Sequence, residues 1–301
     1  MITVIGSINM DLVCETNNLP KHGETVLGGR FETVPGGKGA NQAVAAARLG
    51  SSVTMIGAVG HDSFGSVLKQ KLEDEKVDTS YIECVSTNTG IANIIVYNGD
   101  NQIIVVPGAN FQVTPSMVKK HRELITKSKM VIMQLEIPPE TVEYILDLCR
   151  ELHVPVILNP APAENFQIEW MNKITYLTPN ETEVTEIFGT SPEQAVRKYP
   201  NQLIVTLGES GAMYFDGQEI IKVDGYPVVP VDTTGAGDTF NGAFAHAITE
   251  GKSIKEAVRF ANIAGSLSVE KFGAQGGMPT EAEVVARMKG ERYEEEWNFK
   301  P

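Results

Sequence analysis

The sequence predicts an α/β protein: a doubly wound, mostly parallel sheet flanked by helices, with a small β lid beside it. Short apolar runs alternate with amphipathic helical stretches along most of the 301 residues. The runs are continuously apolar, which is typical of parallel strands covered on both faces. Two early segments interrupt this alternation and look like antiparallel β structure. A chain of this length can bury the core of one large domain.

The main elements follow in chain order, with strands where the apolar runs are short and helices where apolar residues recur every three or four positions. The predicted strands are ITVIG (2–6), VTMIGAV (53–59), MVIMQL (130–135), VPVILN (154–159), ITYLT (174–178) and LIVTLG (203–208). The predicted helices between them are NQAVAAARLG, which ends at Gly50, and residues 139–153, 180–189 and 191–199. After the last strand we predict a hairpin that turns at Asp216-Gly217, then helices at about 236–250, 253–270 and 280–289.

The two interrupting segments span residues 12–34 and 89–106, and the second is a hairpin candidate that turns at residues 98–101. We interpret them as one lid subdomain, formed by two insertions into a single domain of residues 1–301. A surface ornament without function is the alternative. Because residues 91–106 carry apolar side chains on both faces, one face is predicted to cover a ligand. The other face is predicted to contact a second copy in a homodimer.

Composition excludes several classes of partner. The chain is 42% hydrophobic and 21% charged, as in ordinary globular proteins. A net charge of −13 argues against a nucleic-acid or anionic-membrane surface. No apolar run is long enough to span a bilayer, and the N-terminus lacks the basic region of a signal peptide. The three cysteines lie far apart without metal-ligand spacing, so we predict a reducing, cytoplasmic location.

The stretch VDTTGAGDTFNG (231–242) predicts an anion site at the start of a helix. Gly235, Ala236 and Gly237 form a turn whose backbone N–H groups have no helical partner, and the helix dipole adds to their attraction for phosphate. Asp238 follows immediately. This segment alone leaves two readings open for Asp238: a functional acid, or an acid that only stabilises the helix start.

Two motifs near the N-terminus predict a site for a polar ligand. GSINMD (6–11) follows the first strand, so Asn9 and Asp11 stand where parallel sheets bind ligands, although such pairs also occur as plain turn residues. PGGKGANQAVAAARLG (35–50) places Lys38 and Asn41 at a glycine-rich helix start. It is not a Walker A loop, because the glycine spacing and the Ser/Thr are missing.

Three further motifs lie at strand ends. MQLE (133–136) ends a buried strand on Glu136, which is costly unless the acid is wet or paired. In TPNETE (178–183), Asn180 and Glu183 fit a capping box, and the carboxylates also suit a hydrated Mg²⁺ ion. TLGESGA (206–212) is a glycine-rich loop that does not match the GxSxG hydrolase pattern.

Taken together, GSINMD, GGKGAN, MQLE, TPNETE, TLGESG and DTTGAGDTFNG resemble the ribokinase family of carbohydrate kinases. The resemblance keeps the same order and runs to KFGAQGGMP at 271–279. It implies ATP-dependent phosphorylation of the primary hydroxyl of a pentose, D-ribose above all, with Mg²⁺ and a monovalent cation such as K⁺. It also implies a sugar held between the lid and the sheet.

The resemblance assigns roles by motif match. Asp238 would act as the general base, with Gly235, Ala236 and Gly237 as the anion hole. Sugar ligands would be Asn9, Asp11, Gly36, Gly37, Lys38, Asn41, Glu136 and Asp238. Nucleotide ligands would be Asn180, Thr206, Gly208, Glu209, Ser210, Gly211, Gly237 and Asn262. The monovalent cation would lie among Asp232, Thr234, Ser268, Lys271, Gly273 and Gly277, and Glu183 would hold Mg²⁺ through water.

Other functions remain open on the sequence. A kinase of the same family for deoxyribose, a fructose-type sugar or a nucleoside would share most motifs. A sugar-binding regulator without catalysis is expected to lack Asp238 or the preceding glycines, and both are present. A NAD-dependent dehydrogenase is disfavoured because no strand is followed by GxGxxG.

Overall fold

The computed structural model describes residues 1–98 and 100–298, with side chains up to residue 290. Its centre is a parallel sheet of six strands in the order β10-β9-β8-β1-β4-β5, which confirms the predicted fold class. The strands are β1 (Ile2–Ile5), β4 (Val53–Gly60), β5 (Val77–Val85), β8 (Met130–Met133), β9 (Val156–Leu158) and β10 (Tyr176–Leu177). Strand β5 and helices α2 (Ser63–Asp74), α3 (Pro115–Lys120) and α4 (Arg122–Thr126) are additions to the predicted elements.

A second, antiparallel sheet lies beside β10 and contains the predicted hairpin. It is formed by β11 (Ile204–Thr206), β12 (Ala212–Phe215) and β13 (Ile220–Val223). Isolated parallel bridges join Leu177 to Leu203 and Asn180 to Thr206. These bridges bring the carboxyl ends of β10 and β11 to one edge.

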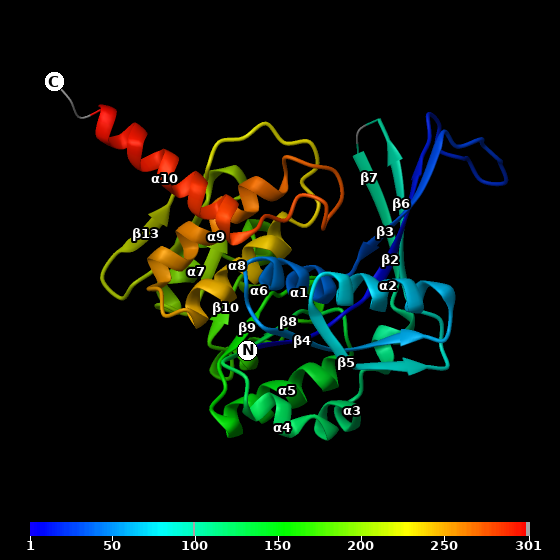
Figure 1. Cartoon of the computed structure of the whole chain (residues 1–301), viewed down its shortest axis with the longest axis horizontal. Helices are drawn as coiled ribbons and strands as arrows, with labels where there is room; N and C mark the ends of the chain where they lie inside the picture. Colours follow the sequence, from blue (N-terminus) through cyan, green and yellow to red (C-terminus); the bar gives the residue numbers. More distant parts are fainter. Residues whose placement is uncertain (99, 299–301) are drawn as a thin grey trace.

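Helices cover both faces of the central sheet (Figure 1). Neighbouring strand residues point to opposite layers: Val4 packs in one hydrophobic cluster and Ile5 in the other. One layer contains α1 (Lys38–Arg48), α2, α8 (Ala236–Thr249), α9 (Ile254–Ser268) and α10 (Glu281–Asn298). The other contains α3 (Pro115–Lys120), α4 (Arg122–Thr126), α5 (Pro139–Leu152), α6 (Glu181–Phe188) and α7 (Pro192–Lys198).

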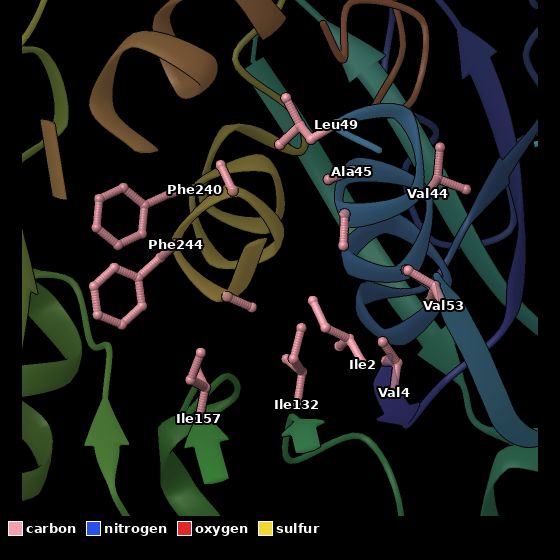
Figure 2. Close-up of a cluster of buried hydrophobic side chains, with 14 of the residues drawn as sticks. Ile2, Val4, Val44, Ala45, Leu49, Val53, Ile132, Ile157, Phe240 and Phe244 are labelled. Carbon is pink, nitrogen blue, oxygen red and sulfur yellow. The ribbon is translucent and has the colours of Figure 1, made fainter. Parts of the chain in front are cut away.

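The first layer fixes where α8 begins. Phe240 and Phe244 of α8 belong to the same hydrophobic cluster as Ile132 and Ile157 of the sheet, and Phe244 is the ring nearer to Ile157 (Figure 2). The two phenyl rings stack with centroids 6.1 Å apart, and Tyr176 meets Phe244 edge-on at 5.2 Å. This packing anchors the helix, so its first turn is held at the carboxyl edge of the sheet.

The remaining sheet, here called the lid sheet, has the order β3-β2-β6-β7 and stands away from the central sheet (Figure 1). Its strands are β2 (Asn9–Glu15), β3 (Arg30–Gly36), β6 (Gly90–Tyr97) and β7 (Asp100–Val106). The expectation of antiparallel structure throughout is wrong at the centre, because β2 and β6 pair in parallel. Both leave the carboxyl edge of the main sheet directly after a parallel strand, β1 or β5, and therefore run the same way. Of the predicted hairpin turn, residue 99 lies outside the described residues.

Several element ends differ from the predicted ones. Helix α1 begins at Lys38, so KGAN forms its first turn, and α10 continues to Asn298. Strand β8 ends at Met133, which leaves Glu136 in the connection to α5. Within the described part of the chain, no helix combines the length and apolarity needed to cross a bilayer.

Candidate active site

The candidate residues gather at the carboxyl edge of the central sheet, where the strand order changes direction between β1 and β8. Such a switch point opens a crevice because the connections leave on opposite faces. The connection after β1 leads into the lid sheet, and the one after β8 carries Glu136. The first turns of α1 and α8 face each other there, since these helices pack side by side.

Asp238 lies in the first turn of α8 and is only 8% exposed. Each carboxylate oxygen accepts one amide hydrogen bond: Oδ2 from Asn41 Nδ2 and Oδ1 from Gln42 Nε2, both at 2.9 Å. Burial raises the pKa of Asp238, while Lys38 and these two hydrogen bonds oppose the rise. The result is a fixed carboxylate whose proton affinity exceeds that of an ordinary aspartate.

The turn before Asp238 presents backbone N–H groups. Gly235 adopts φ 80°, and a Cβ there would lie 2.6 Å from the carbonyl oxygen of Ala274, so only glycine fits. Among the described residues, the amides of Gly235 and Gly237 have no hydrogen-bond partner. The amide of Ala236 donates to the carbonyl of Thr233 at 3.3 Å. Two of the three predicted anion-hole donors are therefore free, and the third is held by a long hydrogen bond.

Four carboxylates interact electrostatically with Lys38, the first residue of α1. Burial would lower the pKa of Lys38, but Asp238, Glu136, Glu183 and Asp11 together raise it. Burial, Glu136 and Asp238 together raise the pKa of Asp11 to about 7, although Lys38 opposes the rise. Glu136 accepts hydrogen bonds from Ser7 Oγ and, at 3.3 Å, from the backbone N–H of Lys38. The cluster thus joins acids from β2, the connection after β8, α6 and α8.

The motifs GSINMD (6–11) and PGGKGAN (35–41) meet where the lid sheet joins the central sheet. Gly36 pairs with Asn9, and a Cβ at Gly36 would lie 2.4 Å from the Asp11 carboxylate oxygens. Gly37 caps α1 with φ 89°. Asn9 Oδ1 accepts from Asn110 Nδ2 at 2.7 Å, which leaves the Asn9 NH₂ group as the free donor of that amide. Donors and acceptors therefore alternate along the edge, as a polyhydroxylated ligand requires.

The candidate nucleotide residues gather around β10, β11 and β13. Asn180 caps α6 in a capping box with Glu183, and Thr206 bridges to Asn180. The backbone of Gly211 lies against the Val223 carbonyl, to which Asn262 Nδ2 donates at 2.9 Å. The short 3-10 helix η4 (Gly208–Ser210) carries three more candidates, Gly208, Glu209 and Ser210, all exposed. The eighth, Gly237, lies in the first turn of α8.

The candidate cation residues are also neighbours. Asp232 accepts hydrogen bonds at 2.9 Å from the N–H groups of Thr234 and Gly273, and these bonds lower its pKa against the opposing effect of burial. The backbone of Gly277 lies against the carbonyl of Ser268. The Ser268 hydroxyl donates to Gly265 instead, so its carbonyl is the group turned to this site. Lys271 is exposed beside it.

A cleft of about 330 Å³ lies between the lid sheet and the loops that lead into α8 and out of α9. Its lid wall is apolar apart from Asp11 and Asn101. The lining residues are Asp11, Val13, Val34, Ile94, Val96, Asn101, Pro230, Val231, Asp232, Thr233, Thr234, Phe272, Gly273 and Ala274.

Sequence reasoning missed several amides and one hydroxyl that hold the candidate residues in place. Gln42 was the easiest to find, because it is the one amide on the otherwise apolar run QAVAAA of α1. The others contact the site through distant parts of the chain and leave no local pattern. These residues are Ser7, Gln42, Asn110, Gln134 and Gln275.

Comparison with known proteins places this geometry in a family. Residues 1–281 match the sequence profile described as pfkB family carbohydrate kinase. The chain is 52% identical to a protein of Bacillus subtilis named ribokinase, over 94% of this chain and 97% of that protein. It is 36% identical to a protein of Salmonella typhi named deoxyribokinase, over 93% and 95% of the two chains. The solved structure of Arabidopsis thaliana ribokinase with ribose and ATP superimposes with a TM-score of 0.88 at 35% identity, covering 96% and 98% of the two chains.

Proposed function

The chain belongs to the pfkB family of carbohydrate kinases, and from this premise we propose that it transfers the γ-phosphoryl group of ATP to the primary hydroxyl of D-ribose, giving ribose 5-phosphate. The relative at 52% identity is named ribokinase, and the structural neighbour at TM-score 0.88 was solved with ribose and ATP. An ATP-dependent sugar kinase accounts for both an anion site and a site for hydroxyls at one edge of the sheet.

The observation that carries the proposal is the placement of Asp238 directly beside the free N–H groups at the start of α8. The primary hydroxyl of the sugar attacks the γ-phosphorus, the bond from phosphorus to the bridging oxygen breaks, and ADP leaves. Asp238 takes the hydroxyl proton as its general base. Its pKa, raised by burial, makes it a stronger base than a solvated aspartate, while Lys38 and the amides of Asn41 and Gln42 oppose its protonation.

The free amides of Gly235 and Gly237 stabilise the charge on the transferred phosphoryl oxygens. Preorganised donors of this kind act without reorganisation at the moment of reaction. The amide of Ala236 joins them once its long hydrogen bond to Thr233 opens. The helix dipole of α8 adds to the same field.

The sugar is held by the acids and amides at the base of the lid sheet. Asp11 and Glu136 accept hydrogen bonds from hydroxyls, and the NH₂ groups of Asn9 and Asn41 donate to them. Lys38 belongs to this group by position, although its charge also interacts with Glu183 on the nucleotide side. Because Gly36 and Gly37 have no side chains, the sugar can approach the backbone closely at these positions.

The nucleotide lies along the ends of β10, β11 and β13, with the phosphates directed to the start of α8. Glu183 fits a role toward Mg²⁺ through water, because only its Oε2 is used in the capping box and its remaining oxygen is free. When bound, Mg²⁺ neutralises charge on the β- and γ-phosphates. The binding residues are Asn180, Thr206, Gly208, Glu209, Ser210, Gly211, Gly237 and Asn262.

The donor set around Asp232 fits a monovalent cation such as K⁺. It combines one carboxylate with main-chain carbonyl oxygens, the ligands that large hard cations prefer. The carbonyls of Thr234, Ser268 and Gly277 accept no hydrogen bond among the described residues. A cation bound there would supply positive charge next to the anion hole. Lys271 and Gly273 complete the set of residues around it.

The lid sheet covers the sugar with its Val13 and Ile94 face and excludes water from the phosphoryl group. The opposite face exposes Phe31 and Ile104, at 64% and 63%, and we propose that it forms a homodimer. A cytoplasmic location remains a prediction in keeping with cysteines that form no disulfide in the described residues.

Deoxyribose is the strongest alternative acceptor, since a relative at 36% identity is named deoxyribokinase. The deciding experiment is a coupled ADP-release assay with ribose, deoxyribose, fructose and adenosine, each with and without K⁺. We expect the highest kcat/KM with ribose and activation by K⁺. A higher value with another acceptor would replace ribose in the proposal, and sugar binding without ADP release would favour a regulator.

A further inference from the structure

The segment 272–278, between α9 and α10, lies against the turn that precedes the candidate base and against α1. Its Gly273 N–H donates to Asp232, and its Ala274 carbonyl packs against Gly235. The side chain of Gln275 reaches further in: its Nε2 donates to Asn41 Oδ1 at 3.0 Å. Gln275 is therefore linked to Asp238 through the side-chain amide of Asn41.

In the contact between Gln275 and Asn41, the donor and the acceptor are defined. An asparagine amide has an acceptor end and a donor end. Because Gln275 donates to the oxygen of Asn41, the nitrogen of Asn41 is turned to Asp238 Oδ2, at 2.9 Å. If Asn41 rotated by half a turn, its oxygen would face the carboxylate and two N–H groups would meet at Gln275. The hydrogen bond from Gln275 therefore favours the orientation in which Asn41 donates to the base.

An ion pair holds Gln275 in place. Nη1 of Arg48 donates to the carbonyls of Gln275 at 2.6 Å and Met278 at 3.0 Å. Nε and Nη2 of the same side chain bind both carboxylate oxygens of Glu75, at 2.7 and 2.6 Å. The Arg48 and Glu75 side chains are only 23% and 28% exposed, so solvent competes weakly for these contacts.

Arg48 lies seven residues after Asn41 on α1, which places both on the same face two turns apart. One helix therefore carries both the amide that contacts the base and the guanidinium that fixes the segment behind it. Any shift of 272–278 relative to α1 changes the hydrogen bond that orients Asn41.

We propose that Gln275 is a positioning residue for phosphoryl transfer, which orients Asp238 through the Asn41 amide, and that the Arg48–Glu75 ion pair fixes Gln275. This inference rests on the proposed function, because it assigns Asp238 the role of base.

The first test measures steady-state kinetics of sugar-dependent ADP release in Gln275→Met and Gln275→Glu. Gln275→Met should lower kcat about 10-fold with little change in the KM for ATP, since misplacement of a reacting group slows chemistry more than binding. Gln275→Glu should lower kcat further, because a carboxylate draws the Asn41 nitrogen away from Asp238. Gln70→Met, which removes an exposed glutamine bonded to Asp74, is the control and should keep wild-type kcat.

The second test asks whether Gln275 acts through Asn41. In the double variant Asn41→Ala/Gln275→Met, kcat should equal that of Asn41→Ala alone, whereas independent contributions would multiply. Arg48→Met should lower kcat by as much as Gln275→Met does. The double variant should lower kcat no further. Arg122→Met removes a similar bidentate pair with Glu151 on the surface and should have no effect on kcat.

A readout without turnover separates this inference from the proposed function. In ¹⁵N-labelled protein, the side-chain NH₂ signals of Asn41 should move in Gln275→Glu and stay in place in Gln70→Met. Unmoved Asn41 signals, a Gln275→Met kcat within twofold of wild type, or multiplicative effects in the cycle would each overturn the inference. A wild-type enzyme without sugar-dependent ADP release would instead refute the proposed function.

Discussion

At the scale of single residues, the site is governed by how one carboxylate is surrounded. Each oxygen of Asp238 accepts from an amide that itself accepts from a second amide: Gln275 behind Asn41, and Gln134 behind Gln42 at 2.6 Å. All donors point toward the acid, and hydrogen-bonded chains of this kind polarise one another. Together with Lys38, these hydrogen bonds oppose the rise in the pKa of Asp238 that burial causes.

Replacing Asp238 by asparagine tests its role. Asp238→Asn preserves the shape of the side chain but removes the proton acceptor, so kcat should fall by about 10²- to 10⁴-fold. Ribose and ATP affinities, measured by isothermal titration calorimetry, should change little. Asp216→Asn, in an exposed hairpin turn, is the control. Turnover near the wild-type rate would refute the general-base assignment.

Asp11 should make sugar use depend on pH. Its pKa is raised to about 7 by burial and by Glu136 and Asp238. Below that pH the protonated group no longer accepts hydrogen bonds from two hydroxyls, so kcat/KM for the sugar should fall as pH decreases from 8 to 6. Asp11→Asn should lower kcat/KM at pH 8 and flatten this limb of the profile. A profile unchanged by the substitution would assign the limb to another group.

The same pKa shift has a consequence for stability. A pKa raised from 3.8 to about 7 in the folded state means that folding favours the protonated acid. This stabilisation is complete below pH 4 and is lost as pH rises through 7. At pH 8 the ionised Asp11 is therefore a cost, and Asp11→Asn should raise Tm there by differential scanning calorimetry. At pH 4 the difference between the two proteins should be small.

At the scale of elements, the lid sheet shows what local sequence determines and what it does not. The strands 9–15, 30–36, 90–97 and 100–106 lie close to the predicted segments, because alternation and turn residues are local signals. The parallel pairing of β2 with β6 joins residues about 80 positions apart and depends on where the main sheet delivers both strands. No pattern within either segment contains that information.

Helix α2 and strand β5 were missed for a related reason. In β5, VDTSYIECV, polar residues separate the apolar ones, because this strand lies at the edge of the sheet and is partly exposed. Fully buried strands such as β4 and β8 were predicted from their continuous apolar runs. The motif residues were likewise visible, whereas Gln134 and Gln275 become meaningful only through long-range contacts.

The two faces of β7 should have separable roles. Ile103 pairs with Ile94 on the cleft side, and Ile104 pairs with Asn93 on the opposite side. Ile104→Asp should therefore convert the expected dimer to a monomer by light scattering at micromolar concentration. Ile103→Asp is the matched control and should remain dimeric while raising the KM for the sugar. A monomeric wild type would end the dimer proposal.

At the scale of the whole molecule, one sheet joins two hydrophobic layers. Ile132 and Met133 are neighbours in β8, both fully buried, and pack in opposite layers. Because every strand serves both layers, neither layer can unfold and leave the other intact.

Ile132→Ala and Met133→Ala should each lower the free energy of unfolding by about 2–5 kcal/mol, the usual cost of such cavities. Urea unfolding followed by circular dichroism should show a single transition in both variants. The KM for sugar and ATP should stay near wild type, since neither side chain reaches the site. Two separate transitions in either variant would show that the layers are independent.

The candidate residues also divide along the chain: apart from Asp238, the hydroxyl-binding set comes from residues 9–136, whereas the phosphate-binding and nucleotide-binding sets come from 180–277. Acceptor choice and donor choice are thus encoded in different stretches of the gene, and they meet only in the finished tertiary structure. Recombination between relatives near residues 140–175 would exchange one substrate preference while leaving the other intact. Such a layout lets new acceptors evolve without rebuilding the machinery that handles ATP.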